Sequence, residues 1–522
     1  MKRRTTLEVE ERPAAKSDSG SSTSVWMATA DVPRVPALGA DASADVCIVG
    51  AGIAGLTTGY LLGREGRSVV VLDDGPLAGG ETCRTTAHLV TALDDRYYEL
   101  EGLHGRKGAH LAAESHRESI DLIERIVADE RIDCDFERLD GYLFCPPGES
   151  TDVLDRELDA AHRAGLADVE KVARAPLPRF DTGPALRFPR QAQFHPLKYL
   201  AGLARAIQRD GGRLYSGTHA QSFEGGKSAL VLTADGHRVD ARAIVVATNA
   251  PVNDRLVIQT KQYANRTYVI AALVPKGSVP RALYWDTAKP YHYVRLQDHD
   301  ARRELLIVGG EDHRTGQADD GETRYTLLEG WMNGRFLEAG PVAFRWSGQV
   351  LEPMDGLAFI GRNPLDKDNV YVATGDSGNG MTHGTIAGRL LTDLILGRDN
   401  EWAHLYDPSR KSLLAAGEYA MGNAHSAAAY SGWLKSGDVE SVEEIKPGEG
   451  AIVRRGLHMV AACRDAAGTL TELSAVCPHL GCIVEWNTSE KTWDCPCHGS
   501  RYAADGHVVN GPAKSGLKPI EK

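Results

Sequence analysis

The sequence contains no uninterrupted apolar run of the roughly 18 residues that a membrane-spanning helix needs. Its opening, Met-Lys-Arg-Arg, is followed by polar, serine-rich sequence without the apolar segment of a secretory signal. We therefore expect no transmembrane segment, a cytoplasmic location, and a disordered tail over residues 1–23.

Positive charge is also in short supply. The 522 residues include 59 Lys and Arg against 71 Asp and Glu, a formal net charge of -12. Sequence-independent binding to nucleic acid depends on clusters of Lys and Arg. The composition therefore argues against nucleic acid as a partner and favours neutral or cationic partners.

Cysteine is scarce, and its distribution is uneven. The chain has 9 cysteines, of which four lie between Cys477 and Cys497 and the others are scattered. In a chain expected in the cytosol, such a cluster predicts metal binding before it predicts a disulfide scaffold. The end of the chain is therefore the place to look for a metal.

Near the other end, residues 45–73 have the pattern strand, glycine turn, helix, strand, acid. Gly50 permits a tight turn, Gly52 lets the backbone approach a pyrophosphate, and Gly55 lets the helix pack closely on the strand. Asp73 follows at the distance at which a carboxylate accepts hydrogen bonds from a ribose. The ordered set predicts a dinucleotide site, which a lone glycine motif would not.

A second dinucleotide fingerprint is missing. The GDSGNG stretch at 375–380 has a different spacing, and the Gly309-Gly310 pair lacks the rest of the pattern. One site predicts one dinucleotide, either FAD or NAD.

Several distant segments resemble FAD-dependent oxidoreductases of the D-amino-acid-oxidase-like superfamily, which includes glycine and sarcosine oxidases. The similar segments are GGETCRTTAH at 79–88, HPLKYLAGLARAI at 195–207, IVVATNAP at 244–251, RWSGQVLEPMDGLAFIG at 345–361 and VYVATGDSGNGMTHGTIAGRLLTDLILG at 370–397. The resemblance implies an α/β fold over residues 24–408, with a Rossmann-like FAD-binding domain interleaved with a mainly antiparallel substrate domain.

In this resemblance the FAD-binding domain takes segments near 40–100, 195–255 and 345–400, and the substrate domain takes 101–194 and 256–344. The residues from Arg84 to Ala87 would wrap the pyrophosphate and flavin. Together, the glycine turn and the resemblance assign FAD contacts to Gly50, Gly52, Ile53, Ala54, Gly55, Asp73, Asp74, Arg84, Thr85, Thr86, Ala220, Ala247, Gly375, Gly380, Met381 and Thr382.

The strand around residues 291–295 is a candidate for the substrate pocket. Tyr291, Tyr293 and Arg295 alternate, so they share one face of the strand. Above a flavin, an arginine beside two tyrosines would suit an amine or amino acid whose carboxylate the guanidinium clamps. The alternative is a surface strand with an exposed arginine, and the pattern alone does not decide between them.

After a helix-compatible linker at 409–438, residues 439–522 predict a small all-β domain. Within it, Cys477-Pro-His479 and Cys495-Pro-Cys497-His498 each offer one thiolate and one imidazole. A 2Fe-2S cluster with two Cys on one iron and two His on the other needs this set. The pattern resembles a Rieske domain, with Cys477, His479, Cys495 and His498 as ligands.

The alternative for these residues is structural zinc, whose usual Cys-x2-Cys and His-x3-His spacings are absent. The resemblance to high-potential Rieske domains further implies a disulfide between Cys482 and Cys497, although free thiols stay possible in the cytosol. It also implies that the hydroxyls of Ser500 and Tyr502 hydrogen-bond the cluster and raise its potential.

These features predict an enzyme that oxidises a C–N bond with FAD and passes electrons through the cluster to an external one-electron carrier. An alternative is an electron-transfer component that serves another redox protein and has no small substrate of its own. A Rieske oxygenase would need a separate iron site. Glu101, His104 and His110 have a superficially suitable spacing but precede the Rieske region, and we reject that hypothesis.

Overall fold

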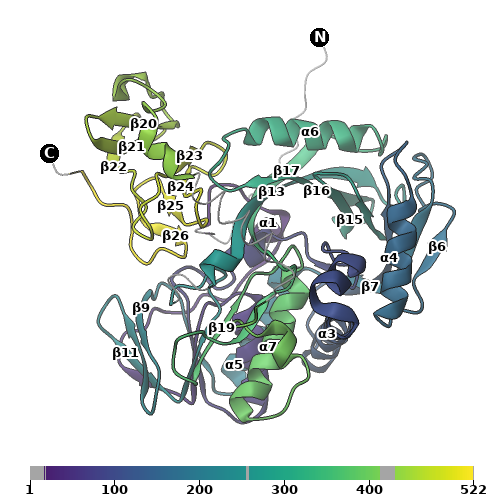
Figure 1. The fold of residues 1–522 in the computed structure, drawn as a ribbon, viewed down its shortest axis with the longest axis horizontal. Helices are drawn as coiled ribbons and strands as arrows, with labels where there is room; N and C mark the ends of the chain where they lie inside the picture. The colour runs from purple at the N-terminus through teal and green to yellow at the C-terminus, as the bar shows by residue number, and fades with distance from the viewer. Residues whose placement is uncertain (1–16, 18, 254–257, 412–428, 521–522) are drawn as a thin grey trace.

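The computed structural model describes residue 17 and residues 19–253, 258–411 and 429–520. The C-terminal strands gather in a small body beside two larger sheets and their helices (Figure 1). Among these residues, none of the helices combines the length and the apolar character that crossing a bilayer requires.

A mainly parallel sheet forms the core of the first part. In spatial order its strands are β18 (Phe359–Arg362), β19 (Val370–Thr374), β12 (Ala243–Val246), β2 (Val46–Val49), β3 (Val69–Leu72) and β8 (Arg213–Tyr215). Only the pairing of β18 with β19 is antiparallel among these strands. Every residue of β2, β3, β12 and β19 is buried, which explains why these strands are nearly continuous apolar runs.

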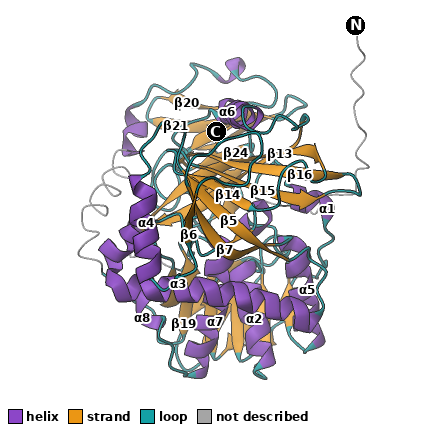
Figure 2. Ribbon diagram, turned by 90° about the vertical axis from the view of Figure 1, so that its right-hand side faces the viewer, coloured by secondary structure: helices purple, strands orange, loops and turns teal. Residues whose placement is uncertain are grey.

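Helices cover one face of this sheet and a second small sheet covers the other. The helices are α2 (Ile53–Arg64), α5 (Pro196–Arg209) and α7 (Gly380–Leu396), which lie in the lower half of Figure 2. The small sheet has the order β1 (Ala42–Ser43), β11 (Arg238–Ala241), β10 (Ala229–Thr233), β9 (Ala220–Glu224). In β2, Ile48 packs with the helices while Cys47 and Val49 pack with the small sheet.

The second part is built on a large, mostly antiparallel sheet. Its main path is β17 (Val342–Pro353), β13 (Gln262–Pro275), β16 (Arg303–Arg314), β15 (His292–Asp298), β14 (Leu283–Asp286), β5 (Glu137–Phe144), β7 (Ala185–Gln193) and β4 (His88–Leu89), with β6 (Glu170–Val172) beside β7. Helix α4 (Asp152–Arg163) packs on β6 and β7, and α6 (Gly321–Asn333) packs on β13 and β16. Helix α3 (Tyr97–Glu130) lies between α4 and α7. The predicted interleaving of a Rossmann-like and an antiparallel domain is confirmed.

The C-terminal body consists of two small antiparallel sheets, as predicted for this region. One has the order β20 (Gly450–Arg455), β21 (His458–Arg464), β22 (Leu470–Ser474), and the other β23 (Glu485–Asn487), β24 (Thr492–Asp494), β25 (Arg501–Ala503), β26 (Val508–Asn510). They share a compact core that includes Trp486, Trp493 and Tyr502.

Short helical turns connect these parts. They are α1 (Val25–Thr29), η1 (Glu81–Arg84), η2 (Gln259–Lys261), α8 (Ala403–Tyr406), η3 (Ala429–Leu434) and η4 (Val442–Glu444). Of the linker predicted as helical at 409–438, residues 412–428 lie outside the described residues, and η3 is a 3-10 helix.

Two predicted boundaries differ from the structure. The FAD-binding segment expected to begin at residue 345 starts inside β17, which pairs with β13 along the large sheet from Val342 to Pro353. The tail expected to be disordered over residues 1–23 includes Ser19, which is fully buried, and Ser22, which hydrogen-bonds Glu490. A serine-rich composition gave no sign of these partners, which lie at the far end of the chain.

Candidate functional site

A cavity begins at the glycine turn after β2 and extends to the large sheet. Gly50 has a φ of +104°, and a Cβ there would lie 2.3 Å from the carbonyl oxygen of Ala247. Gly52, Ile53 and Ala54 line the cavity at the N-terminus of α2, where no acidic side chain stands in the first turn. A helix N-terminus that faces a cavity in this way suits a phosphate group.

Gly55 does not line the cavity, and it allows close packing instead. A Cβ on Gly55 would lie 1.9 Å from the carbonyl oxygen of Gly50. On the neighbouring helix α7, a Cβ on Gly384 would lie 2.5 Å from the side chain of Ile53. These contacts hold α2 close to the glycine turn and to α7, and such close packing is typical of a dinucleotide site.

The two acids after β3 border the same cavity. The carboxylate of Asp73 accepts hydrogen bonds from the backbone N–H of Ala51 at 2.6 Å and of Gly75 at 2.9 Å. Asp74 lies 3.3 Å from the ring of His219. Asp73 therefore holds the glycine turn in place as well as bordering the site predicted for a ribose.

Most of the other residues predicted to contact FAD also line the cavity. They are Thr85, Thr86, Ala220, Ala247, Gly375, Gly380 and Met381. Thr382 is not among the lining residues, and its hydroxyl donates to the carbonyl oxygen of Asn379, just before α7. The cavity is thus lined by residues from distant segments of the chain, at 50–54, 73–86, 220, 247 and 375–381, which contain most of the FAD contacts predicted from the glycine turn and the resemblance.

Arg84 borders the cavity, but its guanidinium is directed elsewhere. Its N–H groups donate to Gly20, Ser22 and Ser347, and it pairs with Glu490 at 3.2 Å. The guanidinium is therefore engaged outside the cavity. The predicted contact of the segment from Arg84 to Ala87 with the pyrophosphate and flavin stays a prediction, and Arg84, Thr85 and Thr86 of that segment line the cavity.

At the far end of the cavity, aromatic and acidic side chains gather around β15. Tyr291 donates its hydroxyl to Asp94 at 2.8 Å, and the Tyr293 hydroxyl lies 2.6 Å from Thr267. Burial raises the pKa of both tyrosines well above the usual value. Both predicted tyrosines therefore line the cavity, together with Trp285.

Arg295 does not reach this cavity, and its predicted role as a substrate clamp is wrong. The residue is fully buried, and it donates hydrogen bonds to the carbonyl oxygens of Thr86, Ala87 and Phe194 and to Gln297. The alternative of an exposed surface arginine is wrong too. Arg295 instead fixes the loop from Thr86 to Ala87 against the large sheet.

The four predicted cluster ligands converge on two facing loops of the C-terminal body. The rings of His479 and His498 lie 5.0 Å apart, centroid to centroid. Nδ1 of His498 is buried and has no hydrogen-bond partner, and burial lowers the pKa of this histidine to about 4. A buried neutral imidazole with a free nitrogen is the form that binds a metal.

The two thiols lie close enough to interact. A hydrogen bond from Cys495, with another from Tyr502, lowers the pKa of Cys477 below its usual value. The Tyr502 hydroxyl lies 3.0 Å from Sγ of Cys477. Two thiol and two imidazole donors on facing loops therefore fit a Rieske-type cluster.

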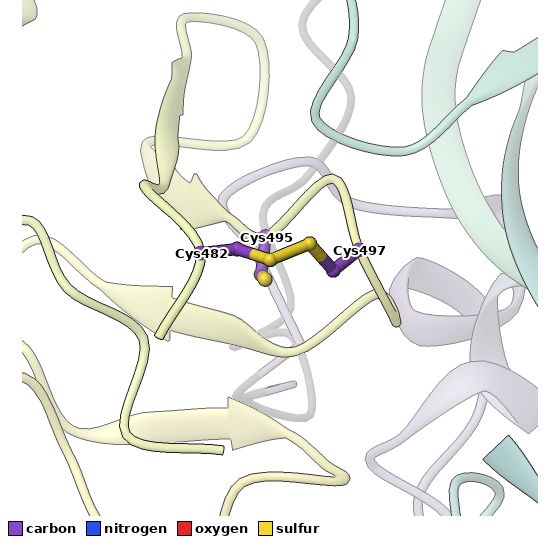
Figure 3. A group of neighbouring side chains, drawn as sticks. All are labelled: Cys482, Cys495 and Cys497. Carbon is purple, nitrogen blue, oxygen red and sulfur yellow. A yellow bond between two sulfur atoms is a disulfide. The ribbon is translucent and has the colours of Figure 1, made fainter. Parts of the chain in front are cut away.

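Cys482 and Cys497 form a disulfide, as the resemblance implied (Figure 3). The sulfur atoms of Cys482, Cys495 and Cys497 all lie within 4.8 Å of one another. The disulfide removes two of these three thiolates, so this group does not make a zinc site. It joins the two loops that carry the candidate ligands.

Buried ion pairs connect the C-terminal body to the rest of the chain. Arg84 pairs with Glu490 at 3.2 Å, and Arg266 lies 3.6 Å from Asp494. Within the C-terminal body, Asp494 also lies 3.2 Å from Arg501. Burial would raise the pKa of Glu490, but Arg84, Arg266 and Arg501 outweigh it and hold the pKa at about 2. The carboxylate is therefore charged at neutral pH and tightly paired.

The C-terminal body also touches the cavity itself. Val508, Val509 and Asn510 of β26 line it beside Gln349. Gln349 donates to the carbonyl oxygen of Gly499, between His498 and Ser500, and Asn510 donates to Glu81. The cluster domain therefore rests against the cavity.

Sequence reasoning missed the residues that make this contact. Gln349 lies in the segment 345–361, which resembles FAD-dependent oxidoreductases, but nothing in the sequence of this segment predicts a contact with Gly499. Glu490 occupies the turn between β23 and β24, where an acid is ordinarily solvent-exposed. The residues proposed for an oxygenase iron site do not converge, since His104 and His110 contact the carbonyl oxygens of Asp355 and Ala164.

Two family descriptions match this chain. "FAD dependent oxidoreductase" matches residues 45–394, and "Rieske 2Fe-2S domain" matches residues 435–521. The matched ranges contain the cavity's glycine turn and the cluster loops respectively.

Similar proteins cover one or both parts. YhfW of Bacillus subtilis (strain 168), which carries the name of a Rieske 2Fe-2S iron-sulfur protein, is 34% identical over 95% of this chain and 97% of its own length. The gamma-glutamylputrescine oxidoreductase of Escherichia coli (strain K12) is 28% identical over 68% of this chain and 84% of its own. The crystal structure of glycine oxidase from Geobacillus kaustophilus has a TM-score of 0.60 at 20% identity, covering 71% of this chain and 99% of that one.

Proposed function

This chain belongs to the FAD-dependent oxidoreductase family and ends in a Rieske 2Fe-2S domain, and from that premise we propose that it oxidises the C–N bond of an amine or amino-acid-like substrate. The electrons then leave through the cluster to an external one-electron acceptor of the ferredoxin, cytochrome or quinone kind. The observation that carries this proposal is the contact of β26 with the cavity, together with the hydrogen bond from the cavity residue Gln349 to Gly499 in the second cluster loop.

Support for C–N oxidation comes from the side chains at the end of the cavity and from a relative. Trp285, Tyr291 and Tyr293 line this end of the cavity, and their aromatic faces can attract a cationic amine. The E. coli relative is named for gamma-glutamylputrescine, a compound with an amine group.

The residues present fit both cofactors. The turn from Gly50 to Ala54 would hold the FAD pyrophosphate, Asp73 the ribose, and the turn from Gly375 to Met381 the flavin ring. Cys477, His479, Cys495 and His498 would hold the cluster. When bound, FAD supplies a two-electron acceptor and the cluster a one-electron carrier.

The protein's own contribution is to position and shield. Burial, with the charge of Arg295, lowers the pKa of His88 to about 3, so this cavity residue stays neutral. The buried ion pair between Glu490 and Arg84 joins the cluster domain to the part of the chain that forms the cavity. Fixed docking favours electron transfer within one chain.

The test is anaerobic titration of the holoprotein with a panel of amines and amino acids, followed by visible absorbance and low-temperature EPR. We expect flavin bleaching followed by the EPR signal of a reduced cluster. In the variant Cys495→Ser, which removes a candidate ligand, the flavin should bleach without the EPR signal. The matched control is Cys463→Ser, which changes a buried thiol outside the ligand set and should behave as wild type.

Two outcomes would contradict the proposal. If no member of the panel bleaches the flavin while a reduced protein carrier does, the chain is an electron-transfer component without its own small substrate. If the flavin bleaches and the cluster stays oxidised, the proposed route through the cluster is wrong.

A further inference from the structure

The aromatic end of the cavity is acidic. Asp94 and Asp312 both line it beside Tyr291 and Tyr293. Asp94 accepts the Tyr291 hydroxyl through Oδ2, while Oδ1 of Asp312 is buried and has no hydrogen-bond partner. Burial, together with the nearby charge of Asp94, raises the pKa of Asp312 to about 7. A hydrogen bond from Thr267 and the charge of Arg324 act in the opposite direction but do not outweigh burial. The end of the cavity thus holds a carboxyl group with one buried oxygen that accepts no hydrogen bond.

Cationic side chains are lacking at this end. Among the cavity-lining residues in the described ranges, Arg84 is the one arginine, and there is no lysine. The guanidinium of Arg84 is paired with Glu490, and that of Arg295 is engaged by backbone carbonyl groups outside the cavity. His88 is neutral because of its lowered pKa. A substrate carboxylate would therefore be buried among acids without a counter-charge, which is strongly unfavourable.

We infer that the substrate is a cationic amine without an α-carboxylate, whose ammonium group is held by Asp94 and Asp312 within the walls of Tyr291 and Tyr293. This inference rests on the proposed function and narrows its substrate class. The two tyrosine rings, 5.5 Å apart, add favourable contact with a cation through their faces. A bound ammonium would also balance the charge of Asp312.

The first experiment compares matched substrates in the holoprotein under anaerobic stopped flow. Cadaverine is lysine without its carboxylate, and agmatine is arginine without its carboxylate. The efficiency of flavin bleaching is measured as the ratio of limiting rate to apparent Kd. We expect it to be at least about tenfold higher for cadaverine than for lysine, and for agmatine than for arginine. Equal or better bleaching by lysine and arginine would overturn the inference and leave the proposed function standing.

The second experiment needs no turnover. The oxidised flavin spectrum is titrated with benzyltrimethylammonium, a cation that has no nitrogen lone pair, and with phenylacetate, an anion of similar shape. We expect a spectral change with the cation and none with the anion at equal concentration. Tighter binding of phenylacetate would overturn the inference. This readout stays decisive even if no amine or amino acid reduces the flavin, in which case the proposed function fails separately.

The variants Asp312→Asn and Asp94→Asn keep the shape of each side chain and remove its charge. Each should raise the Kd of benzyltrimethylammonium about tenfold or more while flavin content stays normal. Asp300→Asn is the matched control, because Asp300 pairs with Arg303 on an exposed turn of the same sheet. Unchanged cation binding in both cavity variants would overturn the assignment to these two carboxyl groups.

Discussion

The side chain of Gln349 donates a hydrogen bond to the carbonyl oxygen of Gly499 at 2.9 Å. Gln349 borders the cavity that we propose for the flavin, and Gly499 lies between the candidate ligand His498 and Ser500. A Cβ on Gly499 would lie 2.4 Å from the side chain of Ala264, so the loop and the large sheet are in close contact here. One side chain therefore links the proposed flavin cavity to the loop that carries the candidate cluster ligands Cys495 and His498.

We predict that Gln349→Leu slows electron transfer from flavin to cluster about tenfold. The substitution leaves the Gly499 carbonyl without its partner, and an unmade buried hydrogen bond costs about 1–3 kcal/mol, enough to displace the loop. Double-mixing stopped flow, with flavin bleaching and cluster reduction followed separately, measures the effect. Flavin reduction should keep its wild-type rate. Gln208→Leu, at an exposed position on α5, is the control, and equal cluster rates in both variants would remove Gln349 from the electron route.

The buried ion pairs should dominate the stability of the domain contact. Glu490→Gln removes the charge that balances Arg84, and losing one partner of a buried pair costs about 3–5 kcal/mol. Urea denaturation should show this loss. Glu472→Gln, which breaks the partly exposed pair with Arg455, should cost at most about 1 kcal/mol. If Glu490→Gln lowers the free energy of unfolding as little as Glu472→Gln does, the pair between Arg84 and Glu490 does not stabilise the domain contact.

The same carboxylate predicts how stability changes in acid. The folded-state pKa of Glu490 is lowered from 4.5 to about 2, so its contribution is present above pH 4.5 and is lost as pH falls toward 2. That contribution is on the order of 3 kcal/mol. The free energy of unfolding of the wild type should therefore exceed that of Glu490→Gln most near neutral pH, and the difference should shrink between pH 4.5 and 2. A constant difference across this range would contradict the lowered pKa.

The sequence alone predicts the features that are encoded within short stretches. The turn from Gly50 to Gly55 and the two cluster loops are local patterns, in which spacing reports geometry because few backbones satisfy it. The disulfide and the interleaved domains were predicted from the resemblance to known families. A family resemblance indicates which distant segments and cysteines come together, and local spacing does not.

What the sequence could not supply is the choice of partner for long polar side chains. Arg84 meets Glu490 across 406 residues, and Ser22 meets the same acid across 468. Arg295 lies on the predicted strand face, yet its side chain is long enough to turn toward the Thr86 carbonyl rather than the cavity. The sequence pattern and the period of a strand or helix predict which face a residue lies on. They do not predict which distant donor or acceptor the end of its side chain reaches.

The hydroxyl of Tyr502 should raise the reduction potential of the cluster. It lies 3.0 Å from Sγ of Cys477, and a hydrogen bond to this candidate ligand would stabilise the more negative reduced state of the cluster. Tyr502→Phe should lower the potential by about 40 mV if that bond is worth about 1 kcal/mol. Redox titration followed by EPR measures the shift. Tyr430→Phe, which removes a hydroxyl bonded to the Leu480 carbonyl instead, should shift the potential much less.

Helix α2 offers a matched pair of glycines that tests the dinucleotide site. Gly55→Ala would place its Cβ 1.9 Å from the Gly50 carbonyl oxygen, and this backbone contact gives way only if the turn moves. We expect the variant to lose FAD, measured as the ratio of flavin to protein absorbance after purification. Gly63→Ala lies on the same helix with nothing within 4 Å of its Cβ. Alanine favours a helix over glycine by about 1 kcal/mol, so this variant should keep its flavin and unfold at the same or a higher temperature. Full flavin occupancy in Gly55→Ala would mean that the turn tolerates displacement and does not hold the pyrophosphate.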